Sequence, residues 1–300
     1  MIIEQIKHSQ FQATLITLKI KAYFELVKFR LSFLVVFSSG IGFMLGTSIP
    51  IRPLEFIVFL IGGFLVTASA NTVNQIIELN LDKLMVRTMN RPLPTKRISK
   101  KEAIVFAIFT SLIGLILLGY FINIFSCLAT FLSAIIYAFV YTPLKKRSSI
   151  AVLVGAIPGA LPPLIGWIAA TGAISMEAII IFGIQFIWQF PHFWAIAWVL
   201  DDDYQKAGFK LLPFGGSKDI NTAFQIMIYT LLLIPLGIIP TKLGFASLNS
   251  GIIITICGVI FLIQTFMLMK DCTNKSARAI MFGSFLYLPI VQIALLWDKL

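Results

Sequence analysis

Apolar residues recur along this chain in runs of about 20, the length of α-helix that crosses the hydrocarbon of a bilayer. Only helices and closed barrels satisfy their backbone hydrogen bonds in lipid, so these runs predict membrane-spanning helices. We expect nine of them, at about 31–49, 54–79, 104–122, 124–142, 151–171, 176–200, 221–240, 246–269 and 279–297.

The composition supports this pattern. Hydrophobic residues make up 58% of the 300 residues and charged residues only 12%, whereas a soluble domain carries about 25% charged residues. A soluble globule has no way to bury so much apolar surface, so the natural solvent is a membrane. We therefore predict an all-α polytopic membrane protein in which residues 1–300 form a single integral-membrane domain.

Positive charge is distributed unequally between the predicted loops. Of the 24 lysines and arginines, only Arg52, Lys242 and Lys299 fall on the side opposite to the N-terminus. Loops rich in Lys and Arg stay in the cytoplasm, which predicts a cytoplasmic N-terminal segment, 1–28, and an external C-terminus. The same asymmetry accounts for the net charge of +11 without a nucleic-acid partner.

The N-terminal segment also indicates the compartment. It contains no arginine and includes Glu4 and Glu25, unlike a mitochondrial presequence, and no signal-peptide cleavage pattern precedes the first span. We expect the bacterial cytoplasmic (inner) membrane. The 3 cysteines are scattered, so neither a disulfide framework nor a thiolate metal site is expected.

Two cytoplasmic connections, at about 80–103 and 201–220, are long and polar, and oxygen-bearing side chains lead into the first. Asn74, Glu78 and Asp82 are four residues apart, so in a helix they lie on one face, each about one turn from the next. Such a column suits Mg²⁺, which takes one or two carboxylates and shares its other ligands with phosphate oxygens.

Two arginines follow this column. Arg87 and Arg91 are again four residues apart and are candidates for binding phosphates in bidentate fashion. A simpler alternative is that Glu78 and Asp82 only pair with Lys83 and Arg87 at the membrane interface. A column of three such side chains at a membrane boundary favours a functional site.

The second connection reads DDDYQKAGFKLLPFGG. Asp202 or Asp203 is a candidate for a second metal or for holding Lys206 in place. Asp202 and Lys206 have the spacing of a helical pair, and Lys206 and Lys210 have the spacing of one helix face. The alternative is a solvated helix end.

The sixth span contains FIWQFPHFWAIAW, in which Pro191 is expected to interrupt the helix beside His192. A neutral imidazole among Trp and Phe side chains can ligate an iron porphyrin or hydrogen-bond a ligand edge. More often a lone membrane histidine bonds a neighbouring helix. After the fourth span, Lys145, Lys146 and Arg147 either reach an anionic substrate or only follow the charge rule.

Five motifs occur in a characteristic order: Asn74-x-x-x-Glu78-x-x-x-Asp82, MVRTMNRPLP, YTPLKKR, WQFPHFWAIAW and DYQKAGFKLLP. Over about residues 25–297 the chain resembles the intramembrane prenyltransferases of the UbiA superfamily. RTMNRPLP, WQFPHFWAIAW and DYQKAGFKLLP together are typical of the haem O synthase branch, the protohaem IX farnesyltransferases.

The resemblance implies nine helices around a central cavity that the two polar loops cap. It implies transfer of a farnesyl group from farnesyl diphosphate to a vinyl group of haem B, with addition of water, giving haem O and diphosphate on the way to the haem A of terminal oxidases. The implied cofactor is Mg²⁺. The implied partners are the two substrates, the lipid bilayer and a haem A synthase that takes the product.

By the same resemblance, Asn74, Glu78 and Asp82 hold Mg²⁺ and the diphosphate, and Arg87 and Arg91 assist them. With the candidates above, the predicted substrate-binding residues are Lys145, Lys146, Arg147, His192, Asp202, Asp203, Tyr204, Lys206 and Lys210. The chain departs from many relatives in having Glu78 in place of Asp and Asn80 in place of an acid. The Asp-x-x-x-Asp motif that the wider superfamily carries in the second loop is absent.

Other functions share part of this pattern. A UbiA-type prenyltransferase for a quinone precursor would use the same acid column but no porphyrin, so haem binding distinguishes the two. A secondary transporter of an organic anion is a further alternative, against which stand the odd number of spans and the charge concentrated at one face. A purely structural membrane subunit would not need these ordered motifs.

Overall fold

The computed structural model describes residues 16–47 and 52–299, among which every regular element is a helix. Nine helices in this part of the chain are long and apolar enough to span a membrane, as predicted. They are α2 (Phe29–Gly46), α3 (Pro53–Ile77), α5 (Lys100–Phe121), a composite helix Ile124–Leu144, α8 (Ala151–Thr171), α9 (Met176–Val199), α11 (Ile220–Lys242), α12 (Leu248–Asp271) and α13 (Asn274–Trp297).

The composite helix and the loops contain shorter elements. The composite consists of α6 (Ile124–Ile135), a π-helix η1 (Ile136–Tyr141) and α7 (Thr142–Leu144). The first cytoplasmic connection begins with α4 (Leu79–Asp82), and the second contains α10 (Asp201–Lys206) and the 3₁₀-helix η2 (Pro213–Gly215). A helix over 16–26 precedes α2, which the sequence pattern did not predict.

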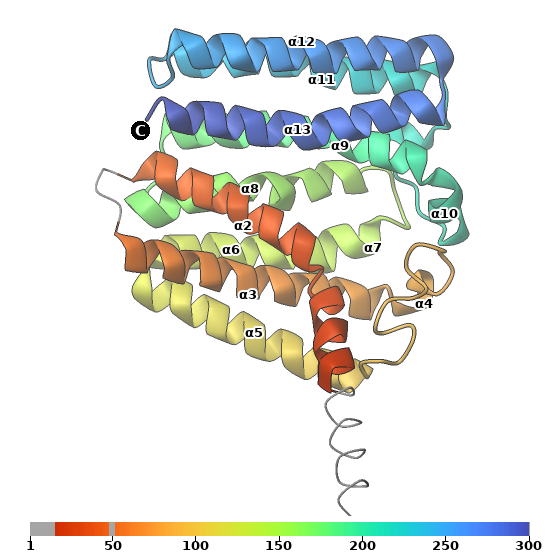
Figure 1. Ribbon diagram of the computed structural model, residues 1–300. Coiled ribbons are helices and arrows are strands. Elements are labelled where there is room, and N and C mark those ends of the chain that lie inside the picture. Colours follow the sequence, from red (N-terminus) through yellow and green to blue (C-terminus); the bar gives the residue numbers. More distant parts are fainter. Residues whose placement is uncertain (1–15, 48–51, 300) are drawn as a thin grey trace, which may run out of the picture.

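The long helices lie side by side, from α5 and α3 at the bottom of Figure 1 to α11 and α12 at the top. α2 and α8 occupy the middle, next to α9 and α13 (Figure 1). α4 and α10 lie at one end of the bundle, and the C-terminus lies at the other. The two polar connections therefore meet over the same end of the helices.

Polar side chains set where many of the helices begin. α5 starts with a capping box, in which Ser99 and Glu102 each accept a backbone N–H of the other. Side-chain caps also start α6, α9, α11, α12 and α13, from Asn123, Ser175, Asp219, Ser247 and Thr273. These caps satisfy amides that have no partner within the helix.

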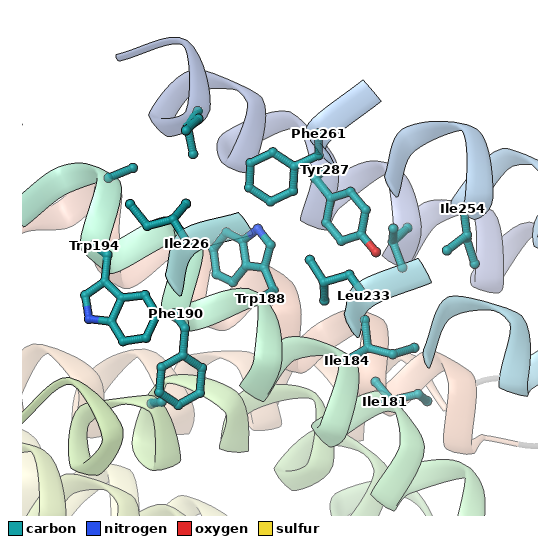
Figure 2. Packing of buried hydrophobic residues seen from close by; sticks show 14 of the residues in the cluster. Ile181, Ile184, Trp188, Phe190, Trp194, Ile226, Leu233, Ile254, Phe261 and Tyr287 are labelled. Carbon is teal, nitrogen blue, oxygen red and sulfur yellow. The ribbon is translucent and has the colours of Figure 1, made fainter. Parts of the chain in front are cut away.

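The largest buried cluster joins α9 to α11, α12 and α13. Figure 2 shows Trp188 and Phe190 of α9 among Ile226, Leu233 and Phe261 of the neighbouring helices. By contrast, many apolar side chains of α5 point outward, which suits contact with lipid acyl chains. This aromatic core fixes the position of α9, the helix that carries His192.

The prediction that Pro191 interrupts the sixth span is wrong, because α9 runs without a break from Met176 to Val199. α8 likewise continues through Pro158, Pro162 and Pro163. A proline removes one backbone N–H, and close packing against neighbouring helices tolerates this in a membrane bundle.

α2 and α8 touch through their backbones at glycine. A Cβ added to Gly166 would lie 1.9 Å from the carbonyl oxygen of Ser39, and one added to Gly42 would lie 2.0 Å from that of Pro163. Small residues at a helix interface permit this approach. The contact fixes two helices that flank the cavity described below.

Gly166→Ala is therefore expected to destabilise the fold, since relieving the overlap costs about 1–3 kcal/mol or more. Thermal unfolding in detergent measures this as a lower midpoint. Gly183→Ala is the matched control, because a Cβ there meets nothing within 4 Å and alanine favours a helix by about 1 kcal/mol. Equal midpoints for the two variants would contradict the backbone contact.

Candidate active site

One cavity with a volume of about 760 Å³ lies among α2, α3, η1, α8, α9 and α13. This volume falls in the range of roughly 300–1,000 Å³ that is usual for cofactor and ligand sites. One end, near α4, is lined by charged and amide side chains, namely Lys28, Arg30, Asn74, Glu78, Asp82, Arg87, Arg91 and Lys145. The rest is lined by aliphatic side chains, a few polar ones and many rings, including Phe37, Tyr137, Trp188, His192, Phe193 and Phe285. The cavity thus combines an ionic end with an aromatic body.

The predicted column of Asn74, Glu78 and Asp82 is present at the ionic end. The helix is not continuous there, because α3 ends at Ile77 and Glu78 has φ −87° and ψ 5°. Backbone hydrogen bonds nevertheless join Glu78 N to Asn74 O (2.9 Å) and Asp82 N to Glu78 O (2.8 Å). The Asn74 side-chain amide donates to Glu78 Oε2 at 3.0 Å. All three side chains are buried.

Each member of the column has its own cation. Lys28 Nζ donates to Asn74 Oδ1 at 2.7 Å, and Arg91 donates to both carboxylate oxygens of Asp82 at 2.9 and 2.8 Å. Lys145 Nζ forms an ion pair with Glu78 Oε1 rather than an aligned hydrogen bond. A buried carboxylate requires such a partner, because an unpaired buried charge is strongly destabilising.

These partners differ from those of the simpler alternative, in which the two acids pair with Lys83 and Arg87. Lys83 is exposed, and Arg87 stands with its guanidinium carbon 5.9 Å from the ring centroid of Tyr204. Arg91 and Lys145 take their places. Arg87, Arg91 and Tyr204 all line the cavity, and their predicted roles, catalytic for the two arginines and substrate-binding for Tyr204, stay predictions.

The donor set fits magnesium. Among the described residues no group of three or more His, Cys, Asp and Glu side chains gathers to bind a metal. The ionic end instead offers two carboxylates and one amide oxygen. Mg²⁺ commonly binds through one or two carboxylates together with substrate phosphates, rather than in an all-protein cage.

Asp203 connects the two polar loops. Its carboxylate accepts the backbone N–H groups of Val86 (2.9 Å) and Arg87 (3.1 Å) and pairs with Lys206 Nζ at 3.1 Å. Burial raises the pKa of Asp203, whereas the two amides and Lys206 lower it, and the net effect is a lowered pKa. Asp203 thus holds Lys206 in place, which is one of the two roles predicted for it. It also fastens the first polar loop to α10.

Asp203→Asn is expected to loosen the segment 83–99. Hydrogen bonds to a charged group contribute about 1.5–3 kcal/mol, and a loss of about 1.4 kcal/mol increases the population of open loop about tenfold. Trypsin cleavage in this segment, followed in membranes with accessible loops, should quicken by a similar factor. Asp202→Asn is the matched control, and equal cleavage rates in the two variants would rule out the fastening role.

Asp202 itself lies outside the cavity. Its side chain is 85% exposed and pairs with Lys218 Nζ at 2.9 Å. The predicted pair with Lys206 is wrong, since Lys206 pairs with Asp203. α10 ends at Lys206, so Lys206 and Lys210 do not share a helix face either, because the helix is too short to continue the spacing.

Several other predicted residues are exposed and absent from the lining of the cavity. They are Lys146, Arg147, Lys206 and Lys210. Only Lys145 of the basic triplet turns inward, directly after α7 ends at Leu144. A role of the four exposed cations in substrate binding stays a prediction.

His192 lines the aromatic body of the cavity, where its ring stacks on Trp188 with centroids 4.4 Å apart and an interplanar angle of 19°. Its Nδ1 lies 2.9 Å from Ser284 Oγ of α13. The sequence pattern singled out His192 but not Ser284.

A polar network that the sequence pattern missed lies in the same part of the cavity. Gln185 Oε1 accepts from Ser38 Oγ (3.0 Å) and from Gln292 Nε2 (2.8 Å). Gln185 and Gln189 both donate to the backbone oxygen of Gly159, at 2.8 and 2.9 Å. Glutamines inside apolar spans are the signal that could have indicated it.

Comparison with known proteins agrees with this architecture. The chain matches the UbiA prenyltransferase family over residues 35–288. A protein from Cytophaga hutchinsonii named protoheme IX farnesyltransferase is 50% identical over 280 residues, which cover 93% of this chain and 98% of the relative.

Solved structures have a similar fold. One reported for digeranylgeranylglyceryl phosphate synthase in membranes has a TM-score of 0.79 at 22% identity and covers 94% of this chain and 99% of its own. A UbiA homolog from Archaeoglobus fulgidus bound to DMAPP and Mg²⁺ has a TM-score of 0.65 at 18% identity, with 91% and 98% covered. The fold, the family match and the 50% sequence identity to a relative over nearly the whole chain all agree. This multi-pass membrane protein belongs to the UbiA prenyltransferase family, in the group of the protoheme IX farnesyltransferases.

Proposed function

We propose that this chain transfers the farnesyl group of farnesyl diphosphate to a vinyl group of haem B. The bond between farnesyl C1 and the diphosphate oxygen breaks, and C1 joins the terminal vinyl carbon. A water adds its oxygen to the inner vinyl carbon, and its released proton leaves with the diphosphate. The products are haem O and diphosphate.

The observation that carries this proposal is that one and the same cavity has an ionic end and an aromatic body. The ionic end suits a diphosphate, and the rings suit a farnesyl chain and a flat porphyrin. Because both regions line one space, a prenyl C1 and a vinyl group can meet between them. Holding both substrates in this way turns a bimolecular reaction into an effectively unimolecular step within the enzyme–substrate complex.

Asn74, Glu78 and Asp82 would hold Mg²⁺ at the ionic end. When bound, the ion neutralises the negative charge that develops on the departing diphosphate. The two carboxylates are already buried and paired, so they can exchange one cationic partner for another without being left alone in a medium of low dielectric.

Arg87, Arg91 and Lys145 would bind the oxygens of the diphosphate. Arg91 and Lys145 now contact Asp82 and Glu78, and uptake of a metal by the acids would free these cations to turn towards the phosphates. Preorganised cations aimed at a leaving group stabilise the transition state more than the ground state.

Loss of diphosphate leaves an allylic cation that bulk water would quench. The rings of Tyr137 and Tyr141 line the cavity beside the ionic end, and Lys145 Nζ already lies 5.1 Å from the Tyr141 centroid. Aromatic faces attract a cation. The apolar body of the cavity limits water, while admitting the one molecule that ends the reaction.

The asymmetry of Lys and Arg supports a bacterial inner membrane in which the ionic end faces the cytoplasm and the C-terminus lies outside. The whole chain, 1–300, would act as one domain. Haem O is an intermediate towards haem A, so a haem A synthase is the proposed consumer of the product.

The test is to incubate membranes that contain this protein with haem B, farnesyl diphosphate and Mg²⁺ and to analyse the haems by mass spectrometry. The proposal requires a magnesium-dependent gain of one farnesyl group plus one water. Unchanged haem in membranes with folded protein would reject the acceptor, and quinone precursors would then be tried with the same diphosphate.

A further inference from the structure

The hydrogen bonds of Ser284 fix the tautomer of His192. Ser284 Oγ lies 2.6 Å from the carbonyl oxygen of Met281, and a carbonyl only accepts, so the single hydroxyl hydrogen points to Met281. Ser284 Oγ must then accept from His192 Nδ1, which lies 2.9 Å away. The imidazole therefore carries its proton on Nδ1 and a free lone pair on Nε2.

The ring is held rigidly in this orientation. Trp188 stacks on one face, and its indole N–H donates to the backbone oxygen of Ser284 at 3.0 Å. Phe193 and Phe285 contact the ring edge-on, each with centroids 5.3 Å apart. Among the described residues, the bond to Ser284 is the only hydrogen bond of the imidazole, which leaves Nε2 unpartnered on a ring that lines the cavity.

His192 lies deeper than the ionic end. It is seven residues from the end of α9 at Val199, which corresponds to about 10 Å of helix, whereas Asn74, three residues from the end of α3 at Ile77, lies only about 5 Å inside its helix. A group bound by His192 would therefore leave the ionic end free for a diphosphate.

We propose that Nε2 of His192 ligates the iron of the porphyrin substrate and so holds the porphyrin in the aromatic body of the cavity, next to the ionic end. This rests on the proposed function, which supplies the porphyrin. Histidine is a common axial ligand of haem iron, and a ligating imidazole normally donates its other N–H to a fixed acceptor, the role that Ser284 Oγ fills.

The test titrates haem B into the purified full-length protein without farnesyl diphosphate and follows visible absorption and electron paramagnetic resonance. Wild type and His8→Ala, the variant of the only other histidine, should show histidine-ligated iron. His192→Ala should lose this signature, and added imidazole should restore it. Ser284→Ala should keep the ligand but bind haem about 10- to 100-fold more weakly.

The outcomes separate this inference from the proposed function. A His192→Ala spectrum equal to that of wild type, with folding confirmed by an unchanged unfolding midpoint, overturns iron ligation and leaves farnesyl transfer to haem standing. Wild-type protein that binds no haem at all rejects both. Loss of binding in His192→Ala without rescue by imidazole also rejects ligation, since a void left by the side chain should admit the free ligand.

Discussion

Asp82→Asn should lower the rate of farnesyl transfer by about 10²–10³-fold, the loss typical of removing one group that stabilises developing charge. The side chain is fully buried, with an exposure of 0%, and is bonded by Arg91. Asparagine has the same shape but only one acceptor oxygen and no charge. It would neither hold a divalent cation nor neutralise Arg91. Glu78→Gln should have an effect of similar size, because Glu78 is buried beside Asn74 and Lys145.

The measurement is the initial rate of haem O formation in membranes with equal amounts of protein. Asp202→Asn makes the same chemical change at an exposed carboxylate outside the cavity and should keep the wild-type rate. Unfolding midpoints of all three variants show whether loss of activity comes from loss of fold. Rates within threefold of wild type for both buried variants would remove the acid column from the reaction.

Removal of magnesium should abolish turnover altogether, and addition of Mg²⁺ after chelation should restore it. Ca²⁺ should restore little, because it prefers six to eight ligands at longer distances and the described residues offer no larger acidic cluster. Turnover that persists in metal-free buffer would contradict the assignment.

A second readout does not depend on turnover. Calorimetric titration of farnesyl diphosphate should show tight binding only with Mg²⁺ present, and Asn74→Ala should raise the concentration of Mg²⁺ needed. Binding that is indifferent to the metal in wild type would show that the cations alone recognise the diphosphate.

Features with a local cause could be predicted from the sequence. The thickness of a bilayer sets the length of each span, so the nine predicted spans agree with the helices of the described residues to within five residues at each end. The spacing of Asn74, Glu78 and Asp82 survives in the structure, because the i to i−4 backbone bonds persist where α3 gives way to α4. His192 was singled out because a polar ring is rare in an apolar span.

Features that depend on packing could not be predicted. Lys28 reaches Asn74 across 46 positions of sequence, after a turn in which Lys28 has φ 49°. The network of Ser38, Gln185 and Gln292 forms only where α2, α9 and α13 meet. A four-residue spacing between Asp202 and Lys206 predicts a contact only if the helix continues beyond both residues. α10 is six residues long and ends at Lys206, so the contact does not form.

The pairing of both cavity carboxylates, Glu78 and Asp82, with a cation of their own has a consequence for the order in which ligands bind. Five cationic side chains and two carboxylates line the cavity, a formal surplus of three positive charges. Free Mg²⁺ approaching alone meets repulsion, whereas a diphosphate, which carries several negative charges, is attracted. The metal is therefore expected to enter together with the prenyl diphosphate as one complex. Such an enzyme responds to the concentration of that complex, and its ionic end stays empty in a cell that is rich in magnesium but short of prenyl donor.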